Sequence, residues 1–421
     1  MRIAIIGAGV SGLVAAYLLS RRHSVQIFER NSYAGGHANT VLVQDEHGDD
    51  LALDVGFVVY APRTYPGFTK LLGELGVETL PSEMSFSVRN DADGFEFSSR
   101  GLRGYLASPR NLLRPSHYRT LWDVARFQRE ARRAVAEDRL HDVAFGDYLE
   151  QAGYSDAFRF GLIVPLTAAT WSNSPADVLG FPANYLFRFL AQHGVLAPRS
   201  IPEWRSIVGG ARSYVNRLLA TLPEGSFSRG SHVQGVRRPE GGGARLTLEE
   251  GVERDFDAVV LACHPDEALD LLDDASPYER AALAGFTYAP NHVVLHTDEQ
   301  FLPKSARARA AWNYETWRGS DGAPATLTMT YDLNRLQSIP GSKHYLVSVN
   351  PGDRVAPESI LAEFDYSHPV YSMRTLEAQR ALKAINGARA THFAGAYLGY
   401  GFHEDGVQSG VEVARALGVE W

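Results

Sequence analysis

Three glycines near the start of the chain have the spacing that binds a dinucleotide. Gly7, Gly9 and Gly12 form the pattern G-x-G-x-x-G directly after the apolar segment Ile3–Ile6 and at the start of a helical pattern. The first glycine permits a tight turn, the second lets the backbone approach a pyrophosphate, and the third lets helix and strand pack closely. The phosphates would then meet the N-terminus of a helix, where free N–H groups favour negative charge.

An acidic residue completes this pattern. Glu29 ends the second apolar segment, Val25–Phe28, about 20 residues after the glycine loop, where a carboxylate can hold ribose hydroxyls. The sequence therefore predicts a strand–turn–helix–strand unit that binds a dinucleotide through Gly7, Gly9, Ser11, Gly12 and Glu29. The alternative is a glycine turn beside an ordinary surface glutamate.

A second pair of glycines, Gly35 and Gly36, follows soon after Glu29. It would place another loop against the cofactor, which nicotinamide enzymes do not usually have. The run resembles the E-R-x-x-x-x-G-G-R-x-x-[ST] segment of the flavin-containing amine oxidase and phytoene desaturase superfamily. This resemblance implies FAD as the cofactor, with Arg30, Gly36 and His37 beside it. His37 stands where the superfamily usually has arginine.

The C-terminal region resembles the same superfamily. Phe393-Ala394-Gly395-Ala396 is similar to its F-x-G-[DE] segment, with Ala396 in place of the acid, and residues 401–410 are similar to the segment that opens its last helix. In the superfamily that helix points backbone N–H groups at the flavin. A helix N-terminus carries about half a positive charge, which would stabilise an anionic reduced flavin. The implied cofactor-binding residues here are Gly395, Asp405, Gly406 and Val407.

The middle of the chain supplies the third part of this pattern. Gly209-Gly210 resembles the superfamily's glycine turn before a helix, and Val233 lies in a strand that resembles the one holding adenine. The resemblance implies an α/β fold of the amine-oxidase type. A discontinuous Rossmann-like FAD-binding domain would comprise residues 1–60, 205–285 and 385–421. An inserted α+β substrate domain would comprise residues 61–204 and 286–384.

The hydrophobic pattern predicts the secondary structure of these parts. A helical period dominates from Tyr65 to about Ala220, interrupted by prolines. Further strands are expected at Val41–Val43, Leu51–Val55, His232–Val236, Arg245–Leu248, Ala258–Ala262, Asn291–Thr297, Ala325–Tyr331, Tyr345–Asn350 and His392–Gly395. The chain should end with a helix from about Gly406 to Leu417.

Candidate catalytic residues are His292, His403 and Glu404. The resemblance places His292 near the position where many amine oxidases have a lysine beside flavin N5, and a structural histidine is the alternative. His403 and Glu404 precede the last helix and should lie close to the flavin, or else order the loop. Candidates for lining the substrate cavity are Tyr60, Trp171, Asn173, Trp312, Tyr397 and Tyr400. No metal site is expected, because the chain has no H-E-x-x-H motif and only one cysteine, Cys263.

Charge and composition argue against a nucleic-acid-binding protein and against a protein that spans a membrane. The formal net charge of −8 disfavours a nucleic-acid partner. No apolar run approaches the ~18–20 residues of a membrane span, and no signal peptide is recognisable, so a cytoplasmic enzyme is expected. Residues 100–133 differ from the rest of the chain in charge. They contain nine arginines and only two acidic residues, Asp123 and Glu130, so their net charge is +7 and that of the remaining residues is −15. This stretch either contacts a membrane surface peripherally or forms a solvated helical face.

The sequence predicts an FAD-dependent oxidoreductase that passes a hydride from an apolar substrate, a fatty-acyl chain or other lipid, to flavin N5 and forms a double bond. Residues 54–60, 307–314 and 401–406 resemble a bacterial subgroup of FAD-binding oxidoreductases, which implies a link to fatty-acid modification. The alternatives are a flavin amine oxidase and a polyene or isoprenoid desaturase. A non-enzymatic flavin-binding protein is a further alternative.

Overall fold

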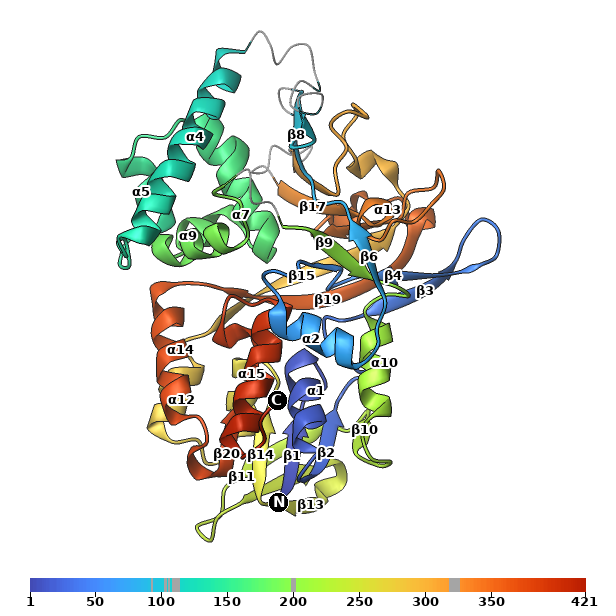
Figure 1. Cartoon of the computed structure of the whole chain (residues 1–421), viewed down its shortest axis with the longest axis vertical. Helices are drawn as coiled ribbons and strands as arrows, with labels where there is room; N and C mark the ends of the chain where they lie inside the picture. Colours follow the sequence, from blue (N-terminus) through green and yellow to red (C-terminus); the bar gives the residue numbers. More distant parts are fainter. Residues whose placement is uncertain (92–93, 102–103, 105–106, 108–113, 198–201, 318–325) are drawn as a thin grey trace.

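A five-stranded parallel sheet forms the centre of one half of the molecule (Figure 1). The computed structural model describes residues 1–421 except 92–93, 102–103, 105–106, 108–113, 198–201 and 318–325. The strand order is β10-β2-β1-β14-β20. The strands are β1 (Arg2–Ile6), β2 (Ser24–Glu29), β10 (Phe227–Arg229), β14 (Ala258–Leu261) and β20 (Thr391–Phe393). They come from the three ranges assigned by sequence to the FAD-binding domain, which makes this part an α/β structure as predicted.

Alternation along β1 explains how this sheet is covered on both faces. Ile3 and Ile5 join one hydrophobic cluster, whereas Ala4 and Ile6 join another, because successive side chains of a strand point to opposite faces. The first face is covered by α1 (Val10–Leu19), α2 (Pro66–Glu74), α10 (Arg212–Ala220) and α15 (His403–Ala416). The second is covered by α11 (Pro265–Leu271), α12 (Pro277–Leu283), α14 (Met373–Ile385) and the antiparallel strands β11 (Val233–Arg237), β12 (Ala244–Leu248) and β13 (Glu253–Phe256).

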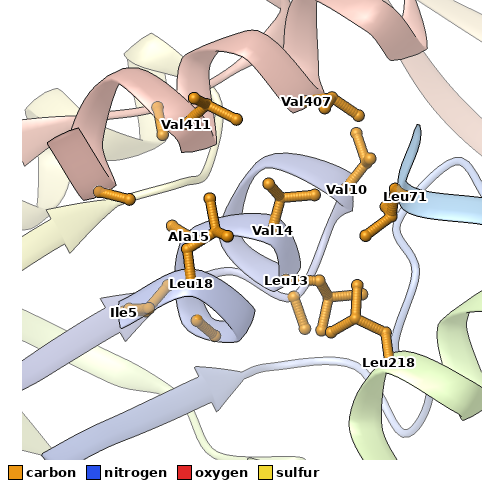
Figure 2. Packing of buried hydrophobic residues seen from close by; sticks show 14 of the residues in the cluster. Ile5, Val10, Leu13, Val14, Ala15, Leu18, Leu71, Leu218, Val407 and Val411 are labelled. Atoms are coloured by element: carbon orange, nitrogen blue, oxygen red, sulfur yellow. The ribbon is translucent and has the colours of Figure 1, made fainter. Parts of the chain in front are cut away.

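The first helix and the last pack against each other through glycines. A Cβ on Gly406 would lie 2.6 Å from Val10 Cγ1, and one on Gly410 would lie 2.7 Å from the Ser11 carbonyl oxygen. Figure 2 shows the apolar side of this contact, with Val407 and Val411 facing Val10 and Val14. The small residues let the N-termini of α1 and α15 meet at one edge of the sheet.

A mixed seven-stranded sheet forms the other half, in the order β19-β15-β18-β17-β16-β7-β8. Its strands are β7 (Phe86–Asn90), β8 (Phe95–Ser98), β15 (Thr287–His296), β16 (Trp312–Trp317), β17 (Thr326–Asp332), β18 (Leu346–Val349) and β19 (Ile360–Val370). A helical lobe lies beside it, made mainly of α4 (Pro115–Ala136), α5 (Phe145–Gln151), α7 (Val164–Trp171), α8 (Pro175–Leu179) and α9 (Ala183–Gln192) (Figure 1). Two small sheets, β3 (Thr40–Gln44) with β4 (Asp50–Asp54), and β5 (Val59–Tyr60) with β9 (Trp204–Ile207) and β6 (Thr79–Ser82), connect the halves.

The structure corrects the predicted helical character of residues 65–220. Strands β6, β7, β8 and β9 lie within this range, and β16 and β19 elsewhere were not predicted. Tertiary pairing explains the difference, because β7 pairs in parallel with β16, a strand more than 200 residues away in sequence. Two helices from the ranges assigned to the substrate domain, α2 and α14, instead pack on the parallel sheet.

Within the described residues, no helix is both long enough and apolar enough to cross a membrane. The arginine-rich range 100–133 is described only in part, because several of its residues before Arg114 lie outside the described ones. Most of what is described forms α4, the outer helix of the helical lobe.

Candidate active site

The glycine loop after β1 adopts the conformation that the spacing predicts. Gly7 has φ +104°, and a Cβ there would lie 2.6 Å from the Ala262 carbonyl oxygen. A Cβ on Gly12 would lie 2.1 Å from the Gly7 carbonyl oxygen, so helix and turn are in close contact. Gly9 differs, because no described atom lies within 4 Å of a Cβ built there. Gly7 and Gly12 are therefore required by the fold, whereas Gly9 faces open space.

The second glycine pair lies directly against this loop. The Gly35 N–H donates to the Ala8 carbonyl oxygen at 2.8 Å, and Gly9 and Gly35 form a parallel β-bridge. Gly36 has φ +58°, and its Cβ would be 3.3 Å from Gly9 Cα. The two loops form one wall, as the sequence predicts from the paired glycines.

A cavity of about 620 Å³, the loop cavity, opens along this wall. Glu29 lies in it at the end of β2, and its carboxylate accepts N–H hydrogen bonds from Ala8 and Asn31, both at 2.8 Å. Arg30 forms an ion pair with Glu267 at 2.6 Å. The predicted cofactor-binding residues that line the loop cavity are Gly7, Gly9, Glu29, Arg30, Gly36, His37 and Val233.

A second cavity of about 460 Å³, the central cavity, lies between the seven-stranded sheet and the helical lobe. The sheet contributes a floor that includes Val293, Val347 and Val349, and the lobe contributes Leu166, Thr170 and Phe189. Six residues line both cavities and mark their junction, namely His37, Ala262, Cys263, His264, Tyr366 and Ser367. A long ligand can therefore extend from one cavity into the other.

The central cavity has an uncharged wall. Among the described residues that line it, none is an aspartate, glutamate, lysine or arginine. Its polar groups are hydroxyls, imidazoles, indole N–H groups, the Cys263 thiol and the backbone. Burial raises the pKa of that thiol, so Cys263 remains a neutral thiol beside the junction.

Three histidines meet at the junction. The ring centroid of His37 lies 5.3 Å from that of His368 and 6.3 Å from that of His264, and its ring stacks on Tyr366 at 4.8 Å. Burial lowers the pKa of His368 to about 4 and also lowers the pKa values of His37 and His264. The cluster is therefore neutral near pH 7. The Nε2 atom of His37 is buried and has no hydrogen-bond partner among the described residues.

His403 lies at the start of α15 and lines the central cavity. Its ring stacks on Phe57 with centroids 3.6 Å apart, and its Nε2 shares a 2.9 Å hydrogen bond with the Tyr214 hydroxyl. Burial lowers the pKa of His403 to about 3. A histidine with this pKa is neutral and a weak base, which favours a positioning role over proton transfer.

The other predicted residues of the last helix lie behind the cavity wall. The Glu404 carboxylate accepts the N–H groups of Gly67 and Phe68, both at 2.9 Å, and therefore caps α2. Asp405 accepts the Phe402 N–H at 2.9 Å, and burial raises its pKa to about 6. Gly406 and Val407 pack against α1, whereas the predicted residues Ser11, Gly395 and His403 at this edge line the central cavity.

His292 lies on the exposed side of β15, beside Asp365, which lines the loop cavity. Its side chain is exposed on β15, where Nε2 is 3.2 Å from Glu363 and Nδ1 is 3.3 Å from Asp365. It is not among the residues that line the central cavity or the loop cavity. Because successive residues of a strand face opposite sides, it is the next residue, Val293, that faces the central cavity. We therefore leave His292 out of the proposed site.

Of the residues expected to line the substrate cavity, Trp171, Trp312 and Tyr397 line the central cavity, whereas Tyr60, Asn173 and Tyr400 do not. The residues that sequence reasoning missed are His264, Tyr366 and His368. His264 could have been found, because it follows β14 at the same sheet edge as the glycine loop, where ligands bind in parallel sheets. Tyr366 and His368 lie on β19, a strand that was not predicted.

Comparison with known proteins defines the class. The model of the flavin-containing amine oxidoreductase family matches residues 10–364. No curated protein sequence matches the chain. Similar solved structures include wild-type putrescine oxidase bound to putrescine (15% identity, 99% of each chain covered, TM-score 0.72). Others are a CLA-producing fatty acid isomerase from P. acnes (17%, 99% of each chain, 0.67) and cyclohexylamine oxidase from Brevibacterium oxydans IH-35A (16%, 99% of this chain and 98% of the other, 0.65).

The chain belongs to the flavin-containing amine oxidoreductase family, with the predicted amine-oxidase type of fold. It is a flavin-dependent oxidoreductase with FAD as its cofactor. The residues fit such a group, because the open space at Gly9 and the unpartnered Nε2 of His37 both face the paired cavities. The loop cavity would hold the dinucleotide part through the two glycine loops and Glu29. The flavin ring would then lie in the central cavity near Ser11, Gly395 and His403.

Proposed function

We propose that this enzyme oxidises an apolar substrate, a fatty-acyl chain or related lipid, at a carbon–carbon bond. The observation that carries the proposal is the uncharged wall of the central cavity. An ammonium group entering this cavity would lose its hydration and find no counter-charge. By contrast, the transfer of a methylene group from water into such a cavity is favourable by about 0.8 kcal/mol.

When bound, FAD supplies the two-electron acceptor, whose N5 takes a hydride. The substrate would lose a hydride from one carbon and a proton, released to water, from its neighbour, which leaves a double bond between them. Turnover would also require oxygen or another two-electron acceptor. The valines of the sheet and the aromatic rings of the lobe would hold the acyl chain, and neutral His403 would position the reacting end.

The comparisons support this proposal at the level of fold, since one similar structure is a fatty acid isomerase. The second candidate is an amine oxidase, which the family and the putrescine oxidase structure favour. Such an enzyme would have to bind the neutral form of the amine against an aromatic wall. A polyene or isoprenoid desaturase remains a third candidate, because the uncharged wall suits that substrate too.

Anaerobic reduction of the flavin distinguishes these candidates. We expect a long-chain acyl ester to bleach the flavin absorbance, and we expect putrescine and cyclohexylamine to leave it unchanged. Bleaching by the amines alone would support the amine-oxidase candidate, and bleaching by a polyene alone would support the desaturase.

A pair of variants tests the role of the uncharged wall. Thr170, which lines the central cavity, and Thr69 on α2 are both half-buried, and each donates its hydroxyl to the carbonyl four residues earlier. Thr170→Asp adds a carboxylate to the cavity and should slow reduction by the acyl ester about tenfold or more. Thr69→Asp makes the same change outside the cavity and should leave that rate unchanged.

A further inference from the structure

The outer face of α4 exposes large apolar side chains in a group. Leu121 and Trp122 have exposed fractions of 42% and 53%, and Tyr118, one turn earlier, has 52%. The opposite face of the helix is buried through His117, Asp123, Phe127, Ala131 and Ala134. The exposed residues are therefore on the side of the helix that faces away from the protein core.

Arginines continue the same face along the helix. Arg129, Arg132 and Arg133 are exposed in the C-terminal half of α4, and Trp122 and Arg129 are separated by two helical turns. Within α4 five arginines accompany only two carboxylates, Asp123 and Glu130, and Asp123 is fully buried. The face therefore combines an apolar end with a cationic end.

Two arginines hold the Trp122 ring. Arg119 and Arg126 lie three residues before and four residues after it, with their Cζ atoms 4.7 and 5.6 Å from the ring. Arg119 also pairs with Asp123 at 3.4 Å, and Arg126 with Glu130 at 2.8 Å. These contacts keep the indole on the outside of the helix instead of folded onto the core.

We propose that this face of α4, defined by Leu121, Trp122, Arg129 and Arg132, docks the enzyme on an anionic lipid surface. Aromatic and aliphatic side chains insert at the headgroup boundary, while arginines extend to the phosphates. The whole chain carries −8, so an anionic membrane repels the molecule except where this cationic face meets it. Charge complementarity therefore favours a lipid surface as the partner and fixes the orientation of docking.

The helical lobe connects this face to the central cavity. Phe127 on α4 packs on Phe187 of α9 with ring centroids 5.5 Å apart, and Phe189 of α9 lines the central cavity. The docking face is thus one helix away from the cavity wall. The inference does not depend on the substrate, since an enzyme of any specificity could carry this surface.

Cosedimentation of the FAD-loaded enzyme with vesicles tests the proposal. We expect binding to vesicles made of equal parts phosphatidylcholine and phosphatidylglycerol, and little binding to pure phosphatidylcholine. The double variant Leu121→Ser/Trp122→Ser and the charge-reversal variant Arg129→Glu/Arg132→Glu should each weaken binding about tenfold or more. Thermal unfolding and flavin content should remain unchanged, because all four side chains are exposed.

Matched variants elsewhere on the surface serve as controls. Tyr278→Ser removes an aromatic ring that is 79% exposed, and Arg237→Glu/Arg254→Glu makes the same charge change on the β11–β13 sheet. Both should bind vesicles like the wild type. The proposal is overturned if the wild type does not sediment with anionic vesicles, or if the controls lose as much binding as the α4 variants. It is also overturned if Leu121→Ser/Trp122→Ser instead converts a dimer in solution into a monomer without affecting vesicle binding.

Discussion

His37 illustrates how a single residue can depart from a family pattern and still fit the site. A neutral imidazole replaces the usual arginine, and its neighbours His264 and His368 are neutral as well. A buried polar nitrogen without a partner is costly, so the unpartnered Nε2 of His37 indicates that a ligand completes its hydrogen bonding. The sequence proposes this position as cofactor-binding, but Tyr366 and His368 of the surrounding cluster lie on β19 and could not be predicted from local patterns.

Gly9 offers the sharpest test of the cofactor site at this scale. Gly9→Val should abolish FAD binding, because the new side chain would occupy the space where the pyrophosphate approaches the backbone. The apoprotein should still fold, since φ at Gly9 is −72° and no described atom lies within 4 Å of the added Cβ. Flavin absorbance after purification and thermal unfolding measure the two effects.

Gly73 on α2 is the matched control for this variant. It is also free of described atoms within 4 Å of an added Cβ, and it lies outside both cavities. Gly73→Val should therefore keep its FAD. Retention of the flavin by Gly9→Val would mean that this loop does not hold the phosphates.

Two acidic residues, Glu404 and Asp54, accept backbone N–H groups at the starts of helices. The sequence predicts Glu404 beside the flavin because it precedes the last helix, yet its carboxylate caps α2. Asp54 belongs to a run noted only for its resemblance, and its carboxylate accepts the Ala211 N–H at 2.8 Å and the Thr40 hydroxyl at 2.6 Å. The Glu404 contacts and the Asp54–Ala211 contact join distant segments, which local spacing does not encode.

Glu404→Ala should lower stability without changing the flavin site. The variant leaves the N–H groups of Gly67 and Phe68 without their acceptor, and the loss of such a cap costs about 1–2 kcal/mol. Glu412→Ala, at an exposed position of the same helix, should cost much less. Chemical denaturation measures both, and a drop in the rate of flavin reduction at unchanged stability would instead restore Glu404 as a catalytic residue.

Asp54 predicts a pH dependence of stability. Burial raises its folded-state pKa to about 7 from an ordinary 3.8, so the folded protein binds a proton there that the unfolded chain releases. Its contribution to stability therefore falls as pH rises between these two values, by at most about 1.4 kcal/mol per pH unit. Asp54→Asn cannot titrate and should lack this slope. The free energy of unfolding of the wild type and of Asp54→Asn is measured as a function of pH. If the two curves run parallel between pH 3.8 and about 7, Asp54 is ionised in the folded protein over this whole range, and the prediction is wrong.

Elements with strong local signals were predicted best. The apolar strands β1, β2 and β14 and the helices α1 and α15 were placed within a few residues, because continuous apolar runs and glycine turns define them. The hairpin of β11 and β12 follows from the glycine-rich turn at residues 239–243. By contrast, β7 and β19 are edge or near-edge strands, and each pairs with a strand far away in sequence, β7 with β16 and β19 with β15. Their pattern alone did not distinguish them from helix or loop.

At the scale of the whole molecule, the cavity exists only where the two halves meet. The parallel sheet supplies the glycine loops, the mixed sheet supplies a valine floor, and the lobe supplies an aromatic roof. Sequence motifs located the cofactor half because its turns are local. The uncharged wall combines residues from widely separated segments, so no local sequence motif predicts it.

The apolar cavity predicts how the rate depends on substrate chain length. Each added methylene should raise kcat/KM about fourfold, the factor that corresponds to about 0.8 kcal/mol, until the acyl chain fills the central cavity. Beyond that length the rate should level off. Thr170→Leu reduces the space at the lobe side and should move the plateau to shorter chains, whereas Thr69→Leu should not. A series of acyl esters of increasing length measures the dependence. A rate that ignores chain length, or a plateau that Thr170→Leu does not move, would show that the acyl chain does not occupy this cavity.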